Sequence, residues 1–267
     1  MRPLGVVGNL SRDRVDGGPP RVGGPPFYAA RALRLLAGPA VVATKLAAED
    51  RPLLLPPLVA TGIPVHWRPA STTAAFTISY DGDARVMTVD AIGEPWSPED
   101  ARGWMAKALG RAEWVHLGAV ARSDFPAETL AALAAGRRLS LDGQGLVRPA
   151  RTGPLELDDA FDRDVLRHVT VLKLAEEEAE AAAGGVDEDT LRLLGVPEVV
   201  VTLGRRGCAL LAGGRLELVP ARPVPNVTDP TGAGDAFAAG YLASRAAGQA
   251  PAAAARRATA LVAALLR

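Results

Sequence analysis

The sequence has little lysine and no net charge. Of its 267 residues 30 are basic and 30 are acidic, and among the basic ones only Lys45, Lys107 and Lys173 are lysine. This balance excludes the overall basic surface that is typical of proteins that bind nucleic acid or anionic membranes. None of the lysines completes the pattern G-x-x-x-x-G-K followed by Ser or Thr, which excludes a lysine-bearing phosphate loop. Any phosphate chemistry should therefore depend mainly on backbone amides, arginines or a metal.

Cysteine, histidine and long apolar runs are also scarce. The single Cys208 excludes an internal disulfide framework and is typical of a protein of the reducing cytoplasm, where we expect this one to reside. The three histidines lack the spacing of a zinc site. No apolar run reaches the roughly 18 residues that a membrane span needs, and the N-terminus lacks the apolar region of a signal peptide. We therefore expect neither a membrane nor a nucleic-acid partner.

Short apolar segments rich in β-branched residues alternate with Ala-, Leu- and Arg-rich segments of helical period. This pattern predicts an α/β fold with a mostly parallel central sheet covered by helices. Strands are expected at residues 4–7, 40–43, 65–67, 114–117, 139–141, 169–174 and 199–203. Helices are expected at 27–36, 98–109, 126–135 and 251–266, the second of them capped by Ser97. With 48% apolar residues the chain can form one large core, and a single domain over 1–267 is expected.

The segment 74–89 departs from this alternation. Phe76, Ile78 and Tyr80 alternate with small or polar residues, and the Asp-Gly pair that follows is a strong hairpin signal. Because a lone two-stranded ribbon is marginally stable, it should pack on a second chain, on the early loop near 10–22, or on a ligand. We expect a small β lid formed by about 10–22 and 70–91, with a homodimer covering its apolar face. A plain edge hairpin is the alternative.

The most informative stretch runs from Asp229 to Asp235 and reads Asp-Pro-Thr-Gly-Ala-Gly-Asp. A helix that begins inside the Gly-Ala-Gly turn directs free amides and the positive end of its dipole at a ligand, and the glycines allow close approach. Such a turn binds anions without lysine. Asp235 in the first helical turn could accept a proton from an attacking hydroxyl. The alternative is an ordinary helix start.

This string resembles the signature of the ribokinase, or pfkB, family of carbohydrate kinases. The resemblance implies a ribokinase-like three-layer fold with a β lid and transfer of the ATP γ-phosphoryl group to a hydroxyl of a sugar or polyol. It makes Asp235 the general base and the amides of Gly232, Ala233 and Gly234 the groups that stabilise charge on the transferring phosphoryl group. It also implies Mg²⁺ on the nucleotide phosphates, and it leaves open whether a monovalent cation is needed.

Other segments match the family in the same order along the chain, so the resemblance covers most of it. The positions that match its acceptor-binding residues are Asn9, Asp13, Gly24, Tyr28, Asp142 and Gln144. Those that match its nucleotide-binding segments are Lys173, Thr202, Gly204, Gly207 and Thr231. Those expected near the metal are Glu178, acting through water, and Asp229. Lys173 itself is read as a strand-end residue that faces solvent or a nucleotide ribose.

Ala175 and Tyr28 depart from the family pattern, with Pro230 as a milder variation, and the acceptor stays open. Ala175 replaces the asparagine of Asn-x-x-Glu, and Tyr28 replaces a common substrate-binding asparagine. The stretches 27–28, 72–73 and 142–145 are similar to short kinases that act on myo-inositol. A nucleoside or a vitamin alcohol is the alternative acceptor. A sugar-binding regulator without catalysis is the alternative outside the enzymes, although retention of Asp235 disfavours it.

Overall fold

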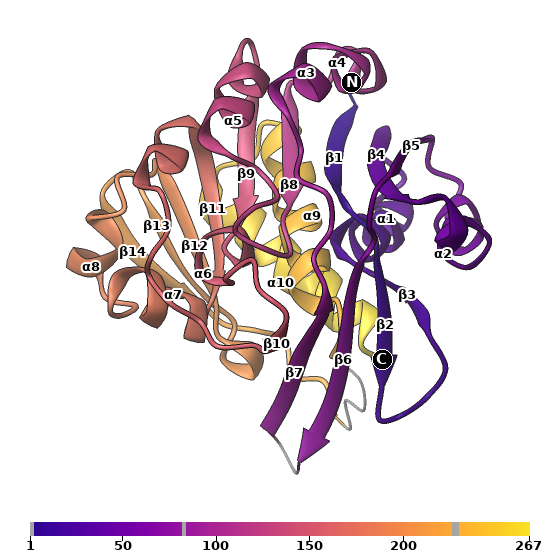
Figure 1. The fold of residues 1–267 in the computed structure, drawn as a ribbon. Helices are drawn as coiled ribbons and strands as arrows, with labels where there is room; N and C mark the ends of the chain where they lie inside the picture. Colours follow the sequence, from indigo (N-terminus) through magenta and orange to yellow (C-terminus); the bar gives the residue numbers. More distant parts are fainter. Residues whose placement is uncertain (1–2, 82–83, 226–229) are drawn as a thin grey trace.

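The apolar segments of the sequence form a large central sheet. In the computed structural model, which describes residues 3–81, 84–225 and 230–267, this sheet has nine strands in the order β14-β13-β12-β11-β9-β8-β1-β4-β5 (Figure 1). The strands are β1 (Leu4–Asn9), β4 (Ala40–Ala47), β5 (Val65–Ala70), β8 (Trp114–Gly118), β9 (Arg138–Asp142), β11 (Val169–Ala175), β12 (Glu198–Thr202), β13 (Cys208–Ala212) and β14 (Arg215–Val219).

The central strands pair in parallel, as the sequence predicts. From β12 to β5 every neighbouring pair is parallel, and only β13 and β14 run antiparallel to their neighbours. Each of the seven expected strands is present, and most extend beyond the expected range. In a parallel sheet the carboxyl ends lie at one edge, where ligands bind in open α/β folds. That edge places the ends of β1, β9, β11 and β12 together.

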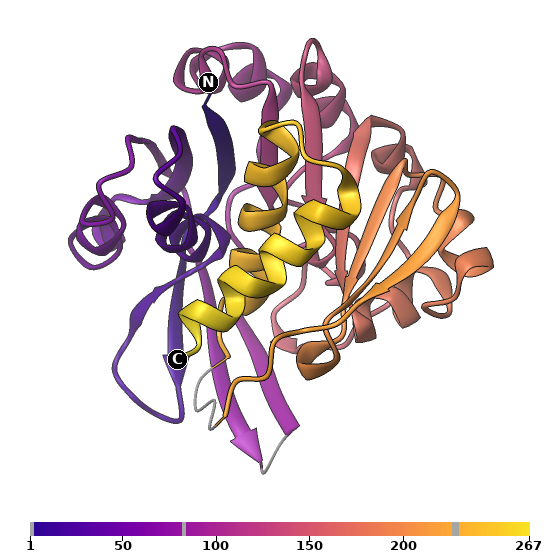
Figure 2. The ribbon, with the colours of Figure 1, turned by 180° about the vertical axis from the view of Figure 1, so that it is seen from behind.

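Helices cover both faces of the sheet, which Figures 1 and 2 show from opposite sides. One face packs against α1 (Pro25–Leu36), α2 (Arg51–Val59), α9 (Ala233–Ala246) and α10 (Pro251–Leu265). The other packs against α3 (Pro98–Arg102), α4 (Trp104–Leu109), α5 (Ala127–Ala134), α6 (Gln144–Val147), α7 (Glu176–Ala183) and α8 (Glu188–Arg192). Three short 3₁₀ turns occur among the described residues, at Ala48–Asp50, Arg163–His168 and Gly204–Arg206. Across the described ranges, no helix combines the length and apolar character that crossing a membrane requires.

Because successive side chains of a strand point to opposite faces, the central sheet contributes to a hydrophobic core on each side. In β4 the side chains of Val41 and Ala43 join the core on one face, and those of Val42 and Leu46 join the core on the other. This two-sided burial is why the central strands appear in the sequence as continuous apolar runs.

The helix expected over 98–109 is interrupted. Ser97 caps it as predicted, since the Asp100 amide donates to Ser97 Oγ at 3.1 Å and the Ser97 amide donates to Asp100 Oδ2 at 3.1 Å. The first helix then ends, and Gly103 has a backbone conformation outside the helical region, with φ −94° and ψ −111°. The segment therefore forms α3 and α4 instead of one continuous helix.

A small second sheet projects from the carboxyl edge of the large one (Figure 1). Its strands in the described chain follow the order β10-β7-β6-β2-β3. They are β2 (Ser11–Val15), β3 (Arg21–Gly23), β6 (Ala74–Asp81), β7 (Ala84–Ala91) and β10 (Gly153–Pro154). The expected hairpin is the antiparallel pair β6–β7, whose turn residues Gly82 and Asp83 lie outside the described residues. β6 pairs in parallel with β2, so the early segment is the partner on which the ribbon packs.

The apolar face of the hairpin is turned toward the rest of the chain. Phe76, Ile78 and Val89 are buried and pack with Val120, which follows β8. Thr77 lies on the outward face, where its hydroxyl donates to Asp90 at 2.8 Å. The face that suggested a homodimer is therefore covered by the chain itself.

Candidate active site

The N-terminus of α9 lies at the carboxyl edge of the central sheet, between the two sheets. Gly232 precedes the helix in the left-handed region, with φ 80°, and a side chain there would overlap the ring of Tyr28, whose Cδ1 would lie 2.1 Å from the added Cβ. Glycine is thus required both by conformation and by the close approach of α1. The Ala233 amide donates to the Pro230 carbonyl at 3.0 Å. Of the three amides expected to bind an anion, that of Ala233 is thus used within the turn.

Asp235 lies in the first turn of α9 with only 8% of its surface exposed. Burial raises its pKa to about 7, and the nearby carboxylate of Asp142 acts in the same direction, whereas Lys173 and Arg148 oppose the rise. A carboxyl group with a pKa near neutrality can exchange a proton at physiological pH, which is the property that a general base requires. One of its oxygens, Oδ1, is buried without a hydrogen-bond partner among the described residues.

Lys173, near the carboxyl end of β11, is buried beside Asp235 and does not face solvent. It is 4% exposed, and its Nζ lies 3.4 Å from Asp142 Oδ2. Burial alone would lower the pKa of this lysine, but the carboxylates of Asp142, Glu178 and Asp235 outweigh it and hold the pKa above its usual value. A Cβ added to Gly234 would lie 2.9 Å from Lys173 Nζ. The permanent cation therefore lies directly against the turn that begins α9, a position that the sequence interpretation missed.

A cavity of about 200 Å³ opens between this cluster and the small sheet. Its polar wall is formed by β2, β11, α6 with the residue that follows it, and the α9 turn, and includes Ser11, Asp13, Gln144, Arg148, Lys173 and Asp235. Its apolar wall is largely formed by the small sheet, and includes Phe76, Ile78, Met87 and Val120. Ile78 and Met87 are direct cross-strand partners of the β6–β7 hairpin. The cavity therefore offers hydrogen bonds to one side of a small ligand and apolar contact to the other.

The structure brings together most of the residues expected at the site. Those that line the cavity are Asp13, Gly24, Tyr28, Gln144, Lys173, Glu178, Thr202, Thr231, Gly232, Gly234 and Asp235. Those described residues that lie outside its lining are Asn9, Asp142, Ala233, Gly204 and Gly207. The expected metal-site residue Asp229 lies outside the described residues.

Asn9 is the last residue of β1 and lies outside the lining of the cavity. Its amide nitrogen donates to the Glu94 carbonyl at 3.2 Å and to Asp124 Oδ1 at 3.4 Å. The polar residue from this part of the chain that does line the cavity is Ser11, on β2. Since residues two apart share a face of a strand, Ser11 lies on the same side of β2 as Asp13. That spacing was the signal by which the sequence could have identified Ser11.

Glu178 is the carboxylate in the cavity wall that fits the expected magnesium site. It is buried, and its Oε2 accepts a hydrogen bond from the Ala175 amide at 2.8 Å, which closes the first turn of α7. In the described ranges no group of three or more His, Cys, Asp and Glu side chains forms a metal cluster. Mg²⁺ commonly keeps several waters and is bound through one or two carboxylates and the phosphates of a substrate. Glu178, with its neighbour Glu177 also in the cavity lining, offers one or two carboxylates at this wall, which is compatible with that kind of site.

A larger cavity of about 420 Å³ lies nearby and shares Tyr28, Thr231 and Gly232 with the first. Its lining is mainly apolar, with Phe27 and Leu265 among the contributors and Arg21 and Arg31 as its charged groups. No carboxylate belongs to its lining among the described residues. The groups that can transfer a proton therefore point to the smaller cavity as the active site.

Comparison with known proteins identifies the family of the chain. A family model described as pfkB family carbohydrate kinase matches residues 21–267. A fructokinase of Klebsiella pneumoniae is 36% identical over 146 residues, which is 51% of this chain and 47% of that enzyme, so the match spans about half of the relative.

Two solved structures share the fold. A pyrophosphate-dependent kinase in the ribokinase family, complexed with a pyrophosphate analogue and myo-inositol, superposes with a TM-score of 0.85 at 22% identity, covering 99% of this chain and 95% of that one. Ribokinase of Arabidopsis thaliana, complexed with ribose and ATP, superposes with a TM-score of 0.74 at 20% identity, covering 100% and 93%. The expected ribokinase-like fold is thereby confirmed, and the chain belongs to the pfkB family of carbohydrate kinases.

Proposed function

We propose that the protein transfers a phosphoryl group to a hydroxyl of a sugar or polyol, with Asp235 as the general base. The observation that carries the proposal is the buried Asp235, with a pKa of about 7, at the N-terminus of a helix and in the wall of the cavity between the two sheets. An ionised Asp235 can take the proton of the acceptor hydroxyl as that oxygen attacks phosphorus.

The residues around Asp235 supply the remaining functions. Asp13, Ser11 and Gln144 line the polar wall and would orient the acceptor through its hydroxyls. Lys173 places a positive charge beside the start of α9, where it would stabilise the charge that develops on the transferring phosphoryl group together with the Gly232 and Gly234 amides. Mg²⁺ held near Glu178 would neutralise charge on the donor phosphates.

The substitution Asp235→Asn tests the base. We expect kcat to fall by roughly 10²–10⁴-fold while the acceptor still binds, because the amide keeps the shape of the side chain but cannot take the proton. Steady-state kinetics and calorimetric binding of the acceptor measure the two effects. The matched control is Asp189→Asn, since Asp189 is also a first-turn aspartate, on α8. If kcat of Asp235→Asn is within twofold of the wild-type value, Asp235 is not the general base.

A small polyol is the acceptor that the cavity favours. The cavity has a volume of about 200 Å³, which is below the range of roughly 300–1,000 Å³ that is typical of sites for drug-sized ligands. A ligand with a single ring therefore fits better than a nucleoside. We propose myo-inositol or a simple sugar. Assays with myo-inositol, fructose, ribose and inosine separate these acceptors, and phosphorylation of inosine alone would overturn the proposal. Calorimetric binding of a sugar with no consumption of donor would instead indicate a regulator.

The donor in this proposal is ATP, and pyrophosphate is the second candidate. Ala175 stands where the family asparagine is expected, which alters the nucleotide side of the site, and a buried Lys173 can hold a terminal phosphate without any contact to a nucleoside. The similarity to the pyrophosphate-dependent kinase agrees with that alternative. Separate assays with ATP and with pyrophosphate as the donor decide between them. Turnover with pyrophosphate and none with ATP would exclude ATP as the donor.

A further inference from the structure

The β6–β7 hairpin supplies the apolar wall of the active-site cavity, and both of its ends are tied to the central sheet. The chain enters the hairpin through Ser71 and Thr73 and leaves it through Glu94. Thr73 Oγ1 accepts a hydrogen bond at 2.8 Å from the amide of Ala47, the last residue of β4. The Glu94 carbonyl accepts one from Asn9 at the end of β1. The two ends of the hairpin thus contact two neighbouring strands of the large sheet.

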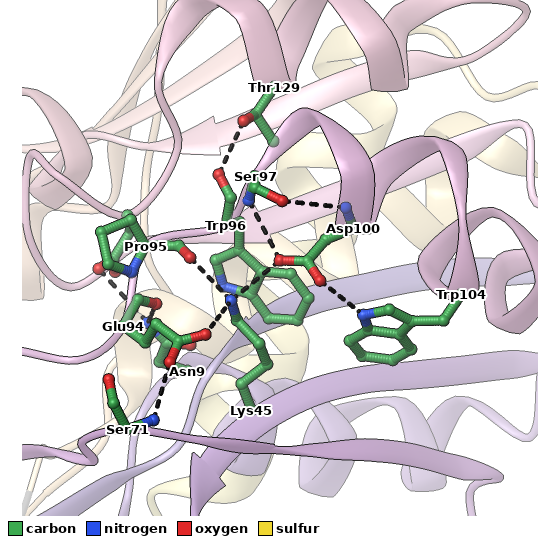
Figure 3. A network of polar contacts seen from close by, with 11 residues as sticks. Asn9, Lys45, Ser71, Glu94, Pro95, Trp96, Ser97, Asp100, Trp104 and Thr129 are labelled. Carbon is green, nitrogen blue, oxygen red and sulfur yellow. Dashed lines mark hydrogen bonds and ion pairs between the residues drawn. The ribbon is translucent and has the colours of Figure 1, made fainter.

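Glu94 joins the two ends of the hairpin to each other (Figure 3). Its Oε2 accepts a hydrogen bond from the Ser71 amide at 2.8 Å, and its Oε1 lies 3.1 Å from Lys45 Nζ. The Ser71 amide, followed by Lys45, holds the pKa of Glu94 below its usual value. Its carboxylate therefore stays ionised near neutral pH and connects the incoming segment, the outgoing segment and β4.

Lys45 is the central residue of this network. Its side chain is 3% exposed, and Nζ also donates to the Pro95 carbonyl at 2.7 Å and to Asp100 Oδ2 at 3.0 Å (Figure 3). The ammonium group lies 4.9 Å from the centre of the Trp96 ring. A buried cation with three oxygen partners and an aromatic neighbour fixes the segment that follows β7 in one position. The chain thus uses two of its three lysines inside the protein, one at the reaction centre and one here.

We propose that Lys45 and Glu94 are positioning residues for the acceptor. They hold both ends of the β6–β7 hairpin against the central sheet and thereby set the distance between the apolar wall, with Ile78 and Met87, and the polar wall that carries Asp235. Neither residue lines the cavity. Their loss should weaken acceptor binding while leaving the proton transfer and donor binding unchanged. The proposal rests on the proposed kinase function.

The test compares Glu94→Ala, Glu94→Gln and Thr73→Val with the wild type. We expect Glu94→Ala and Thr73→Val each to raise the acceptor KM by about tenfold, with kcat and the donor KM within about twofold, since a lost hydrogen bond at a buried partner changes an equilibrium by that order. Glu94→Gln retains an oxygen for the Ser71 amide and should restore part of the effect. Lys45→Met would leave two acids without their cation and is not needed for the decision.

Glu198→Gln is the matched control. Glu198 is a buried carboxylate that Tyr241 and Arg245 bind at 2.6 Å each, far along the sheet from the hairpin. The substitution Glu198→Gln should lower the free energy of unfolding without changing the acceptor KM. If Glu94→Ala behaves in the same way, the network only stabilises the fold and the proposal is wrong.

Amide hydrogen exchange gives a readout that does not depend on activity. Faster exchange over 74–91 in Glu94→Ala, and not in Glu198→Gln, supports the positioning role even if none of the acceptors is phosphorylated, in which case only the proposed function fails. Unchanged exchange over 74–91 would overturn the positioning role whatever the kinetics show.

Discussion

At the scale of single residues, the ionisation of Asp235 should control the rate. Burial raises its pKa from the ordinary value of 3.8 to about 7, so the side chain is neutral below that pH and ionised above it. A general base acts only when ionised, and kcat/KM for the acceptor, which reports the free enzyme, should therefore rise with pH and reach half of its plateau near pH 7. Values of kcat/KM measured between pH 5.5 and 8.5 at subsaturating acceptor test this dependence.

The same profile in Asp235→Asn identifies the group. Because asparagine does not titrate, the remaining slow rate should lose the rise around pH 7. A rise that persists in Asp235→Asn would assign the titration to another group, and Asp189→Asn should keep the wild-type profile.

Single residues also show what the sequence could and could not predict. The Gly-Ala-Gly-Asp turn was identified from local signals, because a helix start and its glycines are encoded by neighbouring residues. The environment of Lys173 depends on Asp142 and Gly234, which are 31 and 61 positions away, so nothing local marks this lysine as buried. Asn9 is similar, since its partners Glu94 and Asp124 come from segments that meet only in the folded chain.

At the scale of elements, the β6–β7 hairpin should determine acceptor selectivity. Met87 lines the cavity, whereas its neighbour Val86 points outward and is 52% exposed. We expect Met87→Ser to lower kcat/KM for the best acceptor by about tenfold, because a lost apolar contact in a substrate pocket has effects of that size. Kinetics with the acceptor panel measure the change.

Val86→Ser is the matched control for Met87→Ser. It makes the same kind of change one residue away, on the opposite face of β7, and should leave kcat/KM within twofold of the wild type. Equal losses in both variants would indicate a general weakening of the hairpin, and the selectivity would then have another origin.

The elements that the sequence predicted correctly are those with a strong local pattern. The buried parallel strands appear as apolar runs, and the hairpin appears as alternation around Asp-Gly. β14 lies at the edge of the sheet with three of its five residues exposed, and β3 and β10 have only three and two residues, so none of them appears in the sequence as a buried apolar run. Their strand state depends on pairing with partners such as β13, β2 and β7.

At the scale of the whole molecule, the candidate active site lies where the two sheets meet. Asp13 and Ile78 come from the small sheet, Gln144 from α6 beside the large one, and Asp235 from α9 near the end of the chain. The order of motifs along the sequence predicted that these segments would form one site. It could not predict the cavity between them, because its volume depends on how far the small sheet stands from the carboxyl edge.

An acceptor bound between the two sheets should stabilise the whole fold. A ligand that binds only the native state at a free concentration of 100 Kd raises the free energy of unfolding by about 2.7 kcal/mol. We expect Asp13→Asn to weaken the acceptor at least tenfold, so that the same concentration adds only about 1.4 kcal/mol or less. Urea unfolding with and without the acceptor measures this difference.

Asp90→Asn, on the outward face of the same small sheet, should retain the full stabilisation because Asp90 is exposed and bonded to Thr77. Full stabilisation in Asp13→Asn would place the acceptor outside the cavity between the sheets.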